Sequence, residues 1–440
     1  MTCIAILLGA PLSPQNLERI GIPYLAPHFD LVVLDCLPWL GRSDAGHAGA
    51  RWEPLERISS EDDLAGALAL HKPLYALDFI GLGPLTPCIQ RVLARAGTAF
   101  VVQKSGSLPL PSLFQRLAWR TRIALERKPT AQAAASVENE SLGTGTLPLK
   151  SVSPIPAPGS AATSAARTAR DSLPARLARK LRTRASLLAP DLALLAGKES
   201  RNAFTRKSRQ ILWTGSQDYH LYQAALGSPQ ASSAPRPYAV FVDDNLPFAS
   251  DWPVLGLEPP VTPQEYYPSM RRFFDAIEAA WQMPVVIAGH PSGRSDKRVQ
   301  QGFGGRSLHH GQTPQLVQDA SAVLLHGSTA VSFAVLGNKP LMFLTTRQLR
   351  RVPYGLHVHT LALRLGQKPL DIDGPCALPP LASLAPRSDL WRRYVEDFLR
   401  APESHESSPW QAFIEHARLQ PANCPAAAPA GRMTGSQNAR

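Results

Sequence analysis

Residues 322–344 read AVLLHGSTAVSFAVLGNKPLMFL and carry the most informative pattern in this 440-residue chain. The apolar run Ala322–Leu325 predicts a buried strand, and a second run at Leu341–Leu344 predicts another. Between them, Ser328–Leu336 has the apolar spacing of a helix, and a glycine and a proline separate it from the second run. A strand, a helix and a strand joined by short turns predict a βαβ unit with parallel strands.

The same alternation extends from this unit toward the N-terminus. Further strands are expected at Tyr238–Val242 and Val285–Ala288, with helices at Tyr266–Trp281 and at Thr313–Ala320, where Thr313 has the chemistry of a cap. The second half of the chain is therefore predicted to form an open, parallel α/β sheet.

The first half shows a similar series of short apolar runs. The expected strands are Cys3–Leu8, Leu31–Leu34, Pro73–Leu77, Ala99–Gln103, Asp191–Ala196 and Arg209–Trp213, and the expected helices are Ser60–Leu70 and Thr86–Ala96. The predicted fold class is α/β, with two Rossmann-like domains facing a cleft. Ligands of such sheets bind outside the carboxyl ends of the strands.

Composition divides the chain further. Residues 129–168 consist mainly of Ala, Ser, Thr, Gly and Pro, which predicts a disordered low-complexity insertion because little apolar surface is available for burial. We expect residues 1–128 and 169–226 to form an N-terminal, acceptor-side domain, and residues 227–400 a C-terminal, nucleotide-donor domain. Residues 401–440 are expected to be a mostly flexible tail.

Positive charge is concentrated in one part of the sequence. The net charge is +12, and residues 101–210 hold 19 Lys and Arg against 6 Asp and Glu. Leucines spaced as on a helix are interleaved there with Arg176, Arg179, Lys180, Arg182 and Arg184. Three interpretations are open: contact with an anionic membrane, contact with nucleic acid, or an ordinary solvated helix. No stacking aromatic residues accompany these charges, so a nucleic-acid partner is not expected.

Other features exclude several protein classes. The 42 prolines argue against a long coiled coil, and no apolar run approaches the roughly 20 residues that span a bilayer. The opening MTCIAILLGAP lacks the basic start of a secretory signal. The five cysteines are odd in number and form no CxxC pair, which argues against a disulfide framework or a zinc ribbon. We expect a cytoplasmic protein with reduced thiols and no bound metal.

The first candidate site follows the predicted strand Ala322–Leu325. His326, Gly327, Ser328 and Thr329 combine a glycine that permits close backbone approach with hydroxyl and imidazole groups at a helix start, which suits a phosphate or diphosphate. The alternative is a helix cap without a ligand.

The second candidate follows the strand Val285–Ala288. Gly289 and His290 precede Pro291 at the same sheet edge, where a loop histidine is available for chemistry or has a structural role. His309 and His310 resemble a metal pair, but adjacent residues of an extended segment point in opposite directions, which favours a structural role.

The third candidate is the acidic pair Asp243 and Asp244, which follows the strand Tyr238–Val242. The two carboxylates would serve as a general base, bind a metal, or cap the turn that follows. Comparable strand ends in the first half supply acceptor-side candidates, namely Asp35, Asp78, Lys104–Ser107 and Gln217–His220.

Three motifs together resemble a known family. VFVDDNLPF (240–248), VVIAGHP (285–291) and HGSTAVSFAVLGNKPLMFL (326–344) resemble the C-terminal domain of bacterial capsule and surface-polysaccharide glycosyltransferases of the GT-B type, including polysialyltransferase-like and Kdo-transferase-like members. The resemblance covers about residues 190–344. It differs at Asn245, where the polysialyltransferase pattern has Gly, and in one Ser-Thr pair where that pattern has a longer serine run.

The resemblance implies a role for each motif. Asp243 or Asp244 would be the base, His290 would contact the nucleotide phosphate or assist the leaving group, and Ser328 and Thr329 would hold the phosphate. It implies a metal-independent donor, with a CMP-sugar favoured over a UDP-sugar or a CDP-linked donor.

The expected function is transfer of a sugar from a nucleotide donor to a growing surface glycan, in capsule or lipopolysaccharide. The expected partners are a nucleotide-sugar, a glycan or lipid-linked acceptor and, through the basic segment, the inner face of the bacterial inner membrane. The alternatives are a nucleotide-sugar epimerase of the same fold and a non-catalytic, membrane-associated assembly factor.

Overall fold

The computed structural model describes residues 1–12, 14–42, 52–104, 106, 108–126, 185–227, 237–249, 252, 257–374 and 377–419. The predicted insertion at 129–168, the basic segment at 176–184 and residues 421–440 lie outside these ranges, as does most of the turn-rich stretch after residue 227. By its internal contacts the chain divides into one unit of residues 1–111 and 187–440 and a second of residues 112–186.

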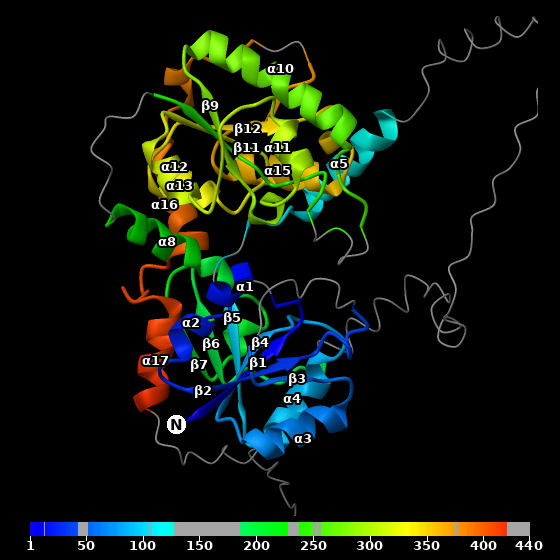
Figure 1. Cartoon of the computed structure of the whole chain (residues 1–440), viewed down its shortest axis with the longest axis vertical. Helices are drawn as coiled ribbons and strands as arrows, with labels where there is room; N and C mark the ends of the chain where they lie inside the picture. Colours follow the sequence, from blue (N-terminus) through cyan, green and yellow to red (C-terminus); the bar gives the residue numbers. More distant parts are fainter. Residues whose placement is uncertain are drawn as a thin grey trace, which may run out of the picture. The chain divides into compact units, whose positions relative to one another are not determined.

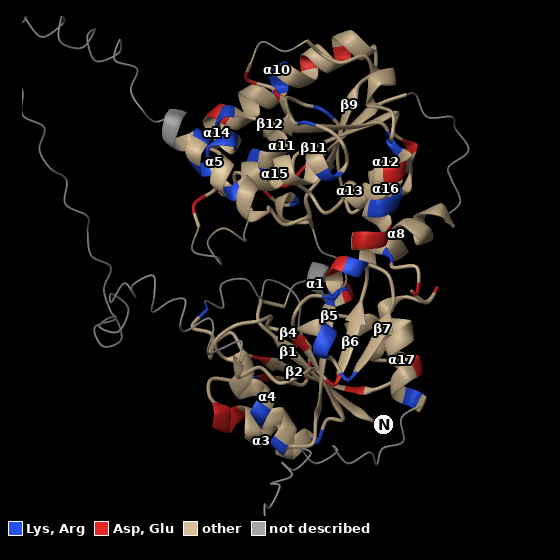
Figure 2. Cartoon of the chain, turned by 180° about the vertical axis from the view of Figure 1, so that it is seen from behind, with Lys and Arg blue, Asp and Glu red and all other residues tan. Residues whose placement is uncertain are grey.

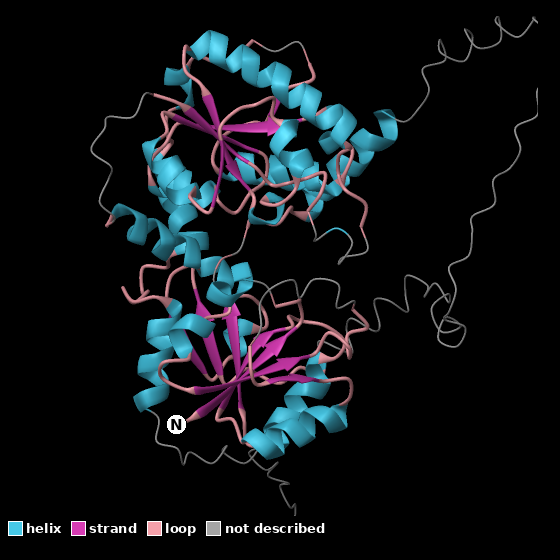
Figure 3. Cartoon of the chain, viewed as in Figure 1, coloured by secondary structure: helices cyan, strands magenta, loops and turns pink. Residues whose placement is uncertain are grey.

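Both predicted parallel sheets are present (Figures 1 and 3). The strands of the first sheet are β1 (Cys3–Leu8), β2 (Asp30–Asp35), β3 (Leu55–Arg57), β4 (Tyr75–Phe79), β5 (Ala99–Lys104), β6 (Leu192–Leu195) and β7 (Gln210–Trp213). They lie in the order β3-β2-β1-β4-β5-β6-β7, and every pairing is parallel. This is the Rossmann order with one further strand.

The helices of the first half follow from the same pattern. They are α1 (Pro14–Arg19), α2 (Ile22–Leu25), α3 (Glu61–His71), α4 (Thr86–Arg95), α5 (Leu113–Glu126) and α8 (Gln217–Leu226), with short 3₁₀ turns η1 (Lys198–Ser200) and η2 (Thr205–Lys207). Alternate residues of β1 face opposite sides of the sheet: Ile4 and Ile6 join the core with α2, while Ala5 and Leu7 join the core with α3 and α4. Apolar side chains therefore cover both faces of the sheet, and helices pack on each face.

The second sheet repeats this topology. Its strands are β8 (Ala239–Val242), β9 (Val285–Gly289), β10 (Leu308–His310), β11 (Ala322–Leu325), β12 (Leu341–Thr345) and β13 (Leu370–Asp371). They lie in the order β10-β9-β8-β11-β12-β13 and are all parallel. The fold-class prediction of two Rossmann-like α/β sheets is confirmed.

The second half contains more helices than the sequence indicated. They are α10 (Pro263–Trp281), η3 (Pro291–Gly293), α11 (Lys297–Gly302), α12 (Thr313–Asp319), α13 (Val331–Leu336), α14 (Arg347–Arg350), α15 (Pro353–Arg364), η4 (Leu381–Leu384), α16 (Ser388–Tyr394), the π-helical turn η5 (Val395–Leu399) and α17 (Pro409–Leu419). The predicted Thr313 cap is wrong, because Gln312 is the N-cap and Thr313 already belongs to α12.

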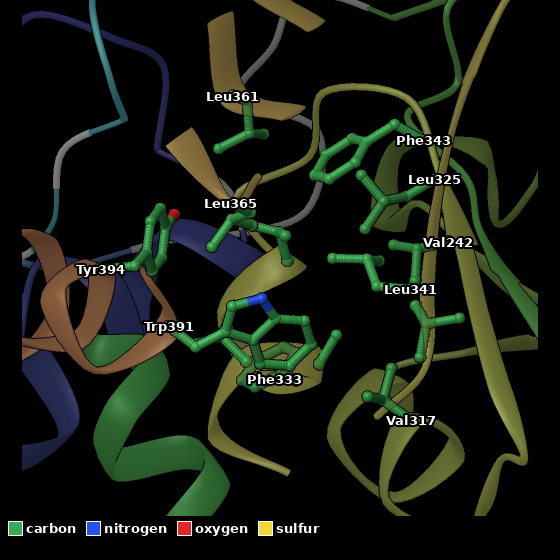
Figure 4. Packing of buried hydrophobic residues seen from close by; sticks show 14 of the residues in the cluster. Val242, Val317, Leu325, Phe333, Leu341, Phe343, Leu361, Leu365, Trp391 and Tyr394 are labelled. Atoms are coloured by element: carbon green, nitrogen blue, oxygen red, sulfur yellow. The ribbon is translucent and has the colours of Figure 1, made fainter. Parts of the chain in front are cut away.

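One face of the second sheet packs on α12, α13, α15 and α16. Figure 4 shows Val242, Leu325 and Phe343 from the strands with Leu361 of α15 and Trp391 of α16 in one apolar cluster. The opposite face packs on α10. The strands are thus buried on both sides, which leaves their carboxyl ends to carry polar groups.

Two helices pack differently from the sequence-based division of the chain. Residues 401–440 were expected to be mostly flexible, but Trp410 and Phe413 of α17 are buried in the core of the first sheet. Residues 169–226 were assigned to the first domain, but Tyr222 of α8 belongs to the core of the second sheet. These contacts join residues far apart in the sequence, which local patterns do not reveal.

Candidate functional site

The polar groups predicted for the second sheet meet where its strand order reverses, between β8 and β11. Asp244 follows β8, and Gly327 follows β11. The Gly327 N–H donates to Asp244 Oδ2 over 3.2 Å, and the Tyr354 hydroxyl donates to the same oxygen over 2.7 Å. One carboxylate therefore links both strand ends to the start of α15, at the position where ligands bind in sheets of this topology.

Close packing explains the glycine at position 327. A Cβ there would lie 3.0 Å from both the Tyr354 hydroxyl and His357 Cδ2. His357 Nε2 also lies 3.2 Å from the Gly327 carbonyl oxygen, to which it donates. Burial raises the pKa of Tyr354 well above its usual value, and the charge of Asp244 adds to this effect. Tyr354 therefore stays protonated and keeps donating to Asp244.

Asp243 is the buried member of the acidic pair, with 2% of its surface exposed. Its Oδ1 accepts the Asn245 N–H over 2.9 Å, while Oδ2 is enclosed without a hydrogen-bond partner among the described residues. Burial raises the pKa of Asp243 to about 7, with the backbone N–H groups of Asn245 and His290 opposing the shift and the charge of Asp244 adding to it. The two adjacent carboxyl groups thus differ in environment: Asp244 is half-buried and hydrogen-bonded, and Asp243 is enclosed.

A hydrogen-bonded series connects β8 to His290 after β9. Asn245, in the left-handed conformation at φ 49°, donates from Nδ2 to Ser292 Oγ over 2.9 Å. Ser292 Oγ lies 2.7 Å from His290 Nδ1, and the Ser292 N–H donates to the same nitrogen over 3.2 Å. Because Nδ1 accepts a backbone N–H, the neutral ring carries its proton on Nε2. His290 is thereby oriented as a donor through Nε2.

Gly289 is needed because it has no side chain, which leaves room for the His310 ring. A Cβ at this position would lie 2.6 Å from His310 Cε1. His310 Nδ1 lies 3.1 Å from the His290 carbonyl oxygen and donates to it, so the His310 ring supports the backbone of the β9 end. This agrees with the structural role that the sequence favoured for His310.

His326 is fully buried. Its Nδ1 donates to the Leu344 carbonyl over 2.8 Å, and its Nε2 accepts the Tyr266 hydroxyl over 3.1 Å. Burial lowers its pKa, which favours this neutral form. The ring joins β11, β12 and α10, and both nitrogens are used within the protein.

Ser328 and Thr329 lie in a turn rather than in a helix. Helix α13 begins at Val331 with Ala330 as its N-cap, so the prediction that the helix starts at Ser328 is wrong. Ser328 Oγ accepts the Ala330 N–H over 3.3 Å, and Thr329 is exposed. The turn presents two hydroxyl groups at the end of β11.

Sequence reasoning missed Tyr354 and His357. Both belong to the beginning of α15, which Pro353 opens, and both side chains lie against Gly327. The available signal was Pro353 as a helix start, followed by an aromatic residue.

The acceptor-side candidates lie at the ends of β2, β4 and β5 and on α8. Asp35 Oδ1 accepts the Leu37 N–H over 3.0 Å, and Asp78 Oδ1 accepts the Ile80 N–H over 2.9 Å. Burial raises the pKa of Asp78, and the backbone N–H groups of Ile80 and Gly81 and the positive charge of Lys104 partly offset this rise. Burial also raises the pKa of Asp218 to about 6. Ser105 and Ser107 lie outside the described residues.

No group of three or more His, Cys, Asp or Glu side chains close enough to hold a metal ion occurs among the described residues. A cavity of about 1110 Å³ lies beside the amino ends of β1 and β4 in the first sheet, and the residues that line it include Thr2, Leu68 and Arg95. It is separate from the Asp243–Asp244 site.

No protein-family model matches this chain, and no curated protein sequence matches it. Solved structures do resemble it. A glycotransferase of kitacinnamycin is 11% identical, covers 95% of this chain and 99% of its own, and has a TM-score of 0.43. UDP-GlcNAc 2-epimerase from Methanocaldococcus jannaschii, in complex with UDP-GlcNAc and UDP, is 10% identical, with coverage of 95% and 100% and a TM-score of 0.42. MurG from Acinetobacter baumannii is 7% identical, with coverage of 96% and 100% and a TM-score of 0.39.

Proposed function

We propose that this protein is a glycosyltransferase that moves a sugar from a nucleotide-activated donor to a growing bacterial surface glycan, in capsule or lipopolysaccharide. The observation that carries the proposal is the convergence of Asp244, Gly327 and Tyr354 at the point where the strand order reverses. The motif resemblance of residues 240–344 supplies the reaction class, and a CMP-sugar is the donor we favour over a UDP-sugar or CDP-linked donor.

The donor phosphate would contact the hydroxyl groups of Ser328 and Thr329 and the Nε2–H of His290. These groups are hydrogen-bond donors, and donors held toward a leaving phosphate stabilise the charge that develops there. His326 has a positioning role in this scheme, because its ring fixes the backbone between β11 and β12.

Asp244 is the carboxylate that we assign to the acceptor, because it is half-buried whereas Asp243 is enclosed. The acceptor hydroxyl gives its proton to Asp244 while its oxygen attacks the anomeric carbon. The bond from that carbon to the phosphate oxygen breaks, and its electrons leave with the nucleotide. Asp243 shapes the turn by accepting the Asn245 N–H.

A thermal-shift screen with CMP, CDP, UDP, GDP and their sugar conjugates tests the donor site. We expect one nucleotide class to raise the melting temperature, because a ligand bound only by the folded state stabilises it. The shift should disappear in the double variant Ser328→Ala, Thr329→Ala. Ser321→Ala, at the opposite end of β11, is the matched control and should retain it.

The stabilising sugar nucleotide then tests the reaction. Incubation with membranes that carry the acceptor glycan should release the free nucleotide and transfer the labelled sugar. Conversion of the sugar nucleotide to an epimer without any acceptor would count against the transferase. No thermal shift with any nucleotide would remove the basis for a donor site.

A further inference from the structure

The two carboxylate oxygens of Asp244 are used differently. Oδ2 accepts both the Tyr354 hydroxyl, over 2.7 Å, and the Gly327 N–H, over 3.2 Å. Oδ1 accepts no hydrogen bond and joins no ion pair within the part of the chain that the structure describes. Asp244 is half-buried, and Oδ1 is not one of the enclosed atoms that lack a partner. Oδ1 is therefore the oxygen that remains for a ligand.

Neighbouring elements hold the Tyr354 ring in place. Helix α15 lies beside β11 in both views of the chain (Figures 1 and 2), so Tyr354 reaches the strand end. Gly355 lets the start of α15 approach α14, because a Cβ there would overlap the Leu349 carbonyl oxygen. The Trp252 ring meets the Tyr354 ring edge-on, with centroids 6.0 Å apart and planes at 88°. Trp252 is itself held, since its Nε1 donates to the Leu246 carbonyl over 2.9 Å.

A tyrosine hydroxyl that only supports the fold has a different kind of partner. Tyr238, just before β8, donates to the Leu316 carbonyl over 2.9 Å, which ties the strand to α12. Tyr354 instead donates to a carboxylate, and hydrogen bonds to ionised groups are shorter and stronger than those between neutral groups. The effect of Tyr354 on the site therefore passes through Asp244.

We propose that Tyr354 is a positioning residue for the Asp244 base, an inference that rests on the proposed transferase function. By binding Oδ2, the hydroxyl fixes the plane of the carboxylate and leaves Oδ1 to take the acceptor proton. The acceptor O–H bond breaks as its proton passes to Oδ1, and the acceptor oxygen forms a bond to the anomeric carbon. The bond from that carbon to the phosphate oxygen breaks, and its electron pair leaves with the nucleotide. The position of the base matters because a misplacement of about 1 Å can cost on the order of 100-fold in rate.

The donor site is a separate set of groups. No hydrogen bond joins Tyr354 to Ser328, Thr329 or His290 among the described residues. Loss of the Tyr354 hydroxyl should therefore lower kcat and leave the binding of the nucleotide-sugar nearly unchanged. A role in folding alone would instead lower the melting temperature without separating kcat from KM.

Tyr354→Phe, which removes only the hydroxyl, is the decisive variant. In the membrane transfer assay with the stabilising sugar nucleotide, kcat should fall about tenfold or more, because the carboxylate is then free to rotate. The KM for the sugar nucleotide, and its dissociation constant from thermal shifts, should stay within about twofold. Tyr238→Phe removes a hydroxyl of the same sheet and is the matched control, which should retain kcat.

A double variant tests whether Tyr354 acts through Asp244. Asp244→Asn should lower kcat by about 100-fold or more, since an amide cannot take the acceptor proton. Adding Tyr354→Phe to it should lower kcat further by less than about twofold, because residues that act as a unit are not additive. Residues that act independently would multiply their effects.

In a chain that transfers sugar, three results would overturn the role of Tyr354 alone. They are an unchanged kcat in Tyr354→Phe, an equal loss of affinity for the sugar nucleotide, and multiplied losses in the double variant. Absence of transfer by the unmodified chain would overturn the proposed function and the role of Tyr354 together. The two failures are therefore distinguishable.

Discussion

At the scale of single residues, Asp243 shows how burial changes the chemistry of an ordinary carboxyl group. Only 2% of its surface is exposed, and Oδ2 has no hydrogen-bond partner among the described residues. Burial leaves the ionised form poorly solvated and raises the pKa from 3.8 to about 7, although the backbone N–H groups of Asn245 and His290 oppose the rise. Its neighbour Asp244 differs because Gly327 and Tyr354 donate to it.

This difference predicts how stability depends on pH. The folded chain keeps the Asp243 proton up to about pH 7, while the unfolded chain loses it near the usual pKa. The stabilising contribution is present in full below the unfolded pKa and is lost as the pH rises through the folded value. We expect Asp243→Asn to remove this loss, which amounts to about 2–3 kcal/mol of unfolding free energy between about pH 5 and pH 8.

Urea unfolding at a series of pH values measures the effect. Asp62→Asn, on the exposed start of α3, controls for removal of a carboxylate from the surface. An Asp243→Asn variant that lost as much stability toward high pH as the unmodified chain would show that this group is not responsible.

Residue-level prediction from the sequence reached the polar groups that follow a strand and missed groups whose contacts depend on a partner remote in the sequence. Asp244 and Gly327 were singled out because each follows a strand. Tyr354 was missed because its role arises from a hydrogen bond to a residue 110 positions away. The sequence likewise does not show that Asp243 is buried, because its burial depends on residues that are remote in the sequence.

At the scale of elements, helix α17 depends on the first sheet, although more than 180 residues separate it from β7. Trp410 is 4% exposed, and a Cβ on Gly21 would lie 2.5 Å from its ring. Gly21 has φ 83°, so the turn before α2 uses glycine both for its conformation and for this contact. The helix therefore belongs to the core of that sheet.

Removing this contact should destabilise the protein. We expect Trp410→Ala to reduce the free energy of unfolding by about 3–5 kcal/mol, because it leaves a large cavity against α2 and β4. Leu419→Ala on the same helix, where the side chain is 82% exposed, should change it by about 0.5 kcal/mol or less. Chemical denaturation of both variants checks this, and equal midpoints would contradict the assigned role of α17.

Helices and strands were predicted from the sequence where their apolar pattern was long enough to recognise, and the shortest strands were missed. β1 and β11 match their expected bounds, and most other predicted elements of the two sheets differ by one to three residues at an end. β3, β10 and β13 were missed because strands of two or three residues carry no periodicity. The start of α13 was misplaced because Ser328 and Thr329 have cap chemistry but form a turn.

At the scale of the whole molecule, Gly197 marks a close contact between the segment after β6 and the π-helical turn η5. A Cβ on Gly197 would lie 2.3 Å from the backbone nitrogen of Phe398. Nearby, the Ala401 N–H donates to the Ala196 carbonyl over 3.1 Å, and Lys198 pairs with Glu396 over 2.6 Å. Backbone lies against backbone here, so no side-chain movement could relieve a clash.

Gly197→Ala should therefore be costly. We expect a loss of about 1–3 kcal/mol or more in unfolding free energy, because η5 must shift and the Ala401 hydrogen bond must lengthen. Gly83→Ala, where nothing lies within 4 Å of the added Cβ, is the control and should be nearly neutral. Denaturation midpoints measure both, and a Gly197→Ala variant as stable as the control would contradict the close contact.

The sequence by itself determined the two parallel α/β sheets and the strand ends that carry polar residues, because apolar periodicity and turn residues act within a few positions of the chain. Only the tertiary structure decided which of those polar residues meet. It joined Asp244 to Gly327 and Tyr354, enclosed Asp243 and His326, and packed α17 into the core of the first sheet. Hydrogen bonds and burial depend on distances between residues remote in the sequence, and the folded chain alone establishes those distances.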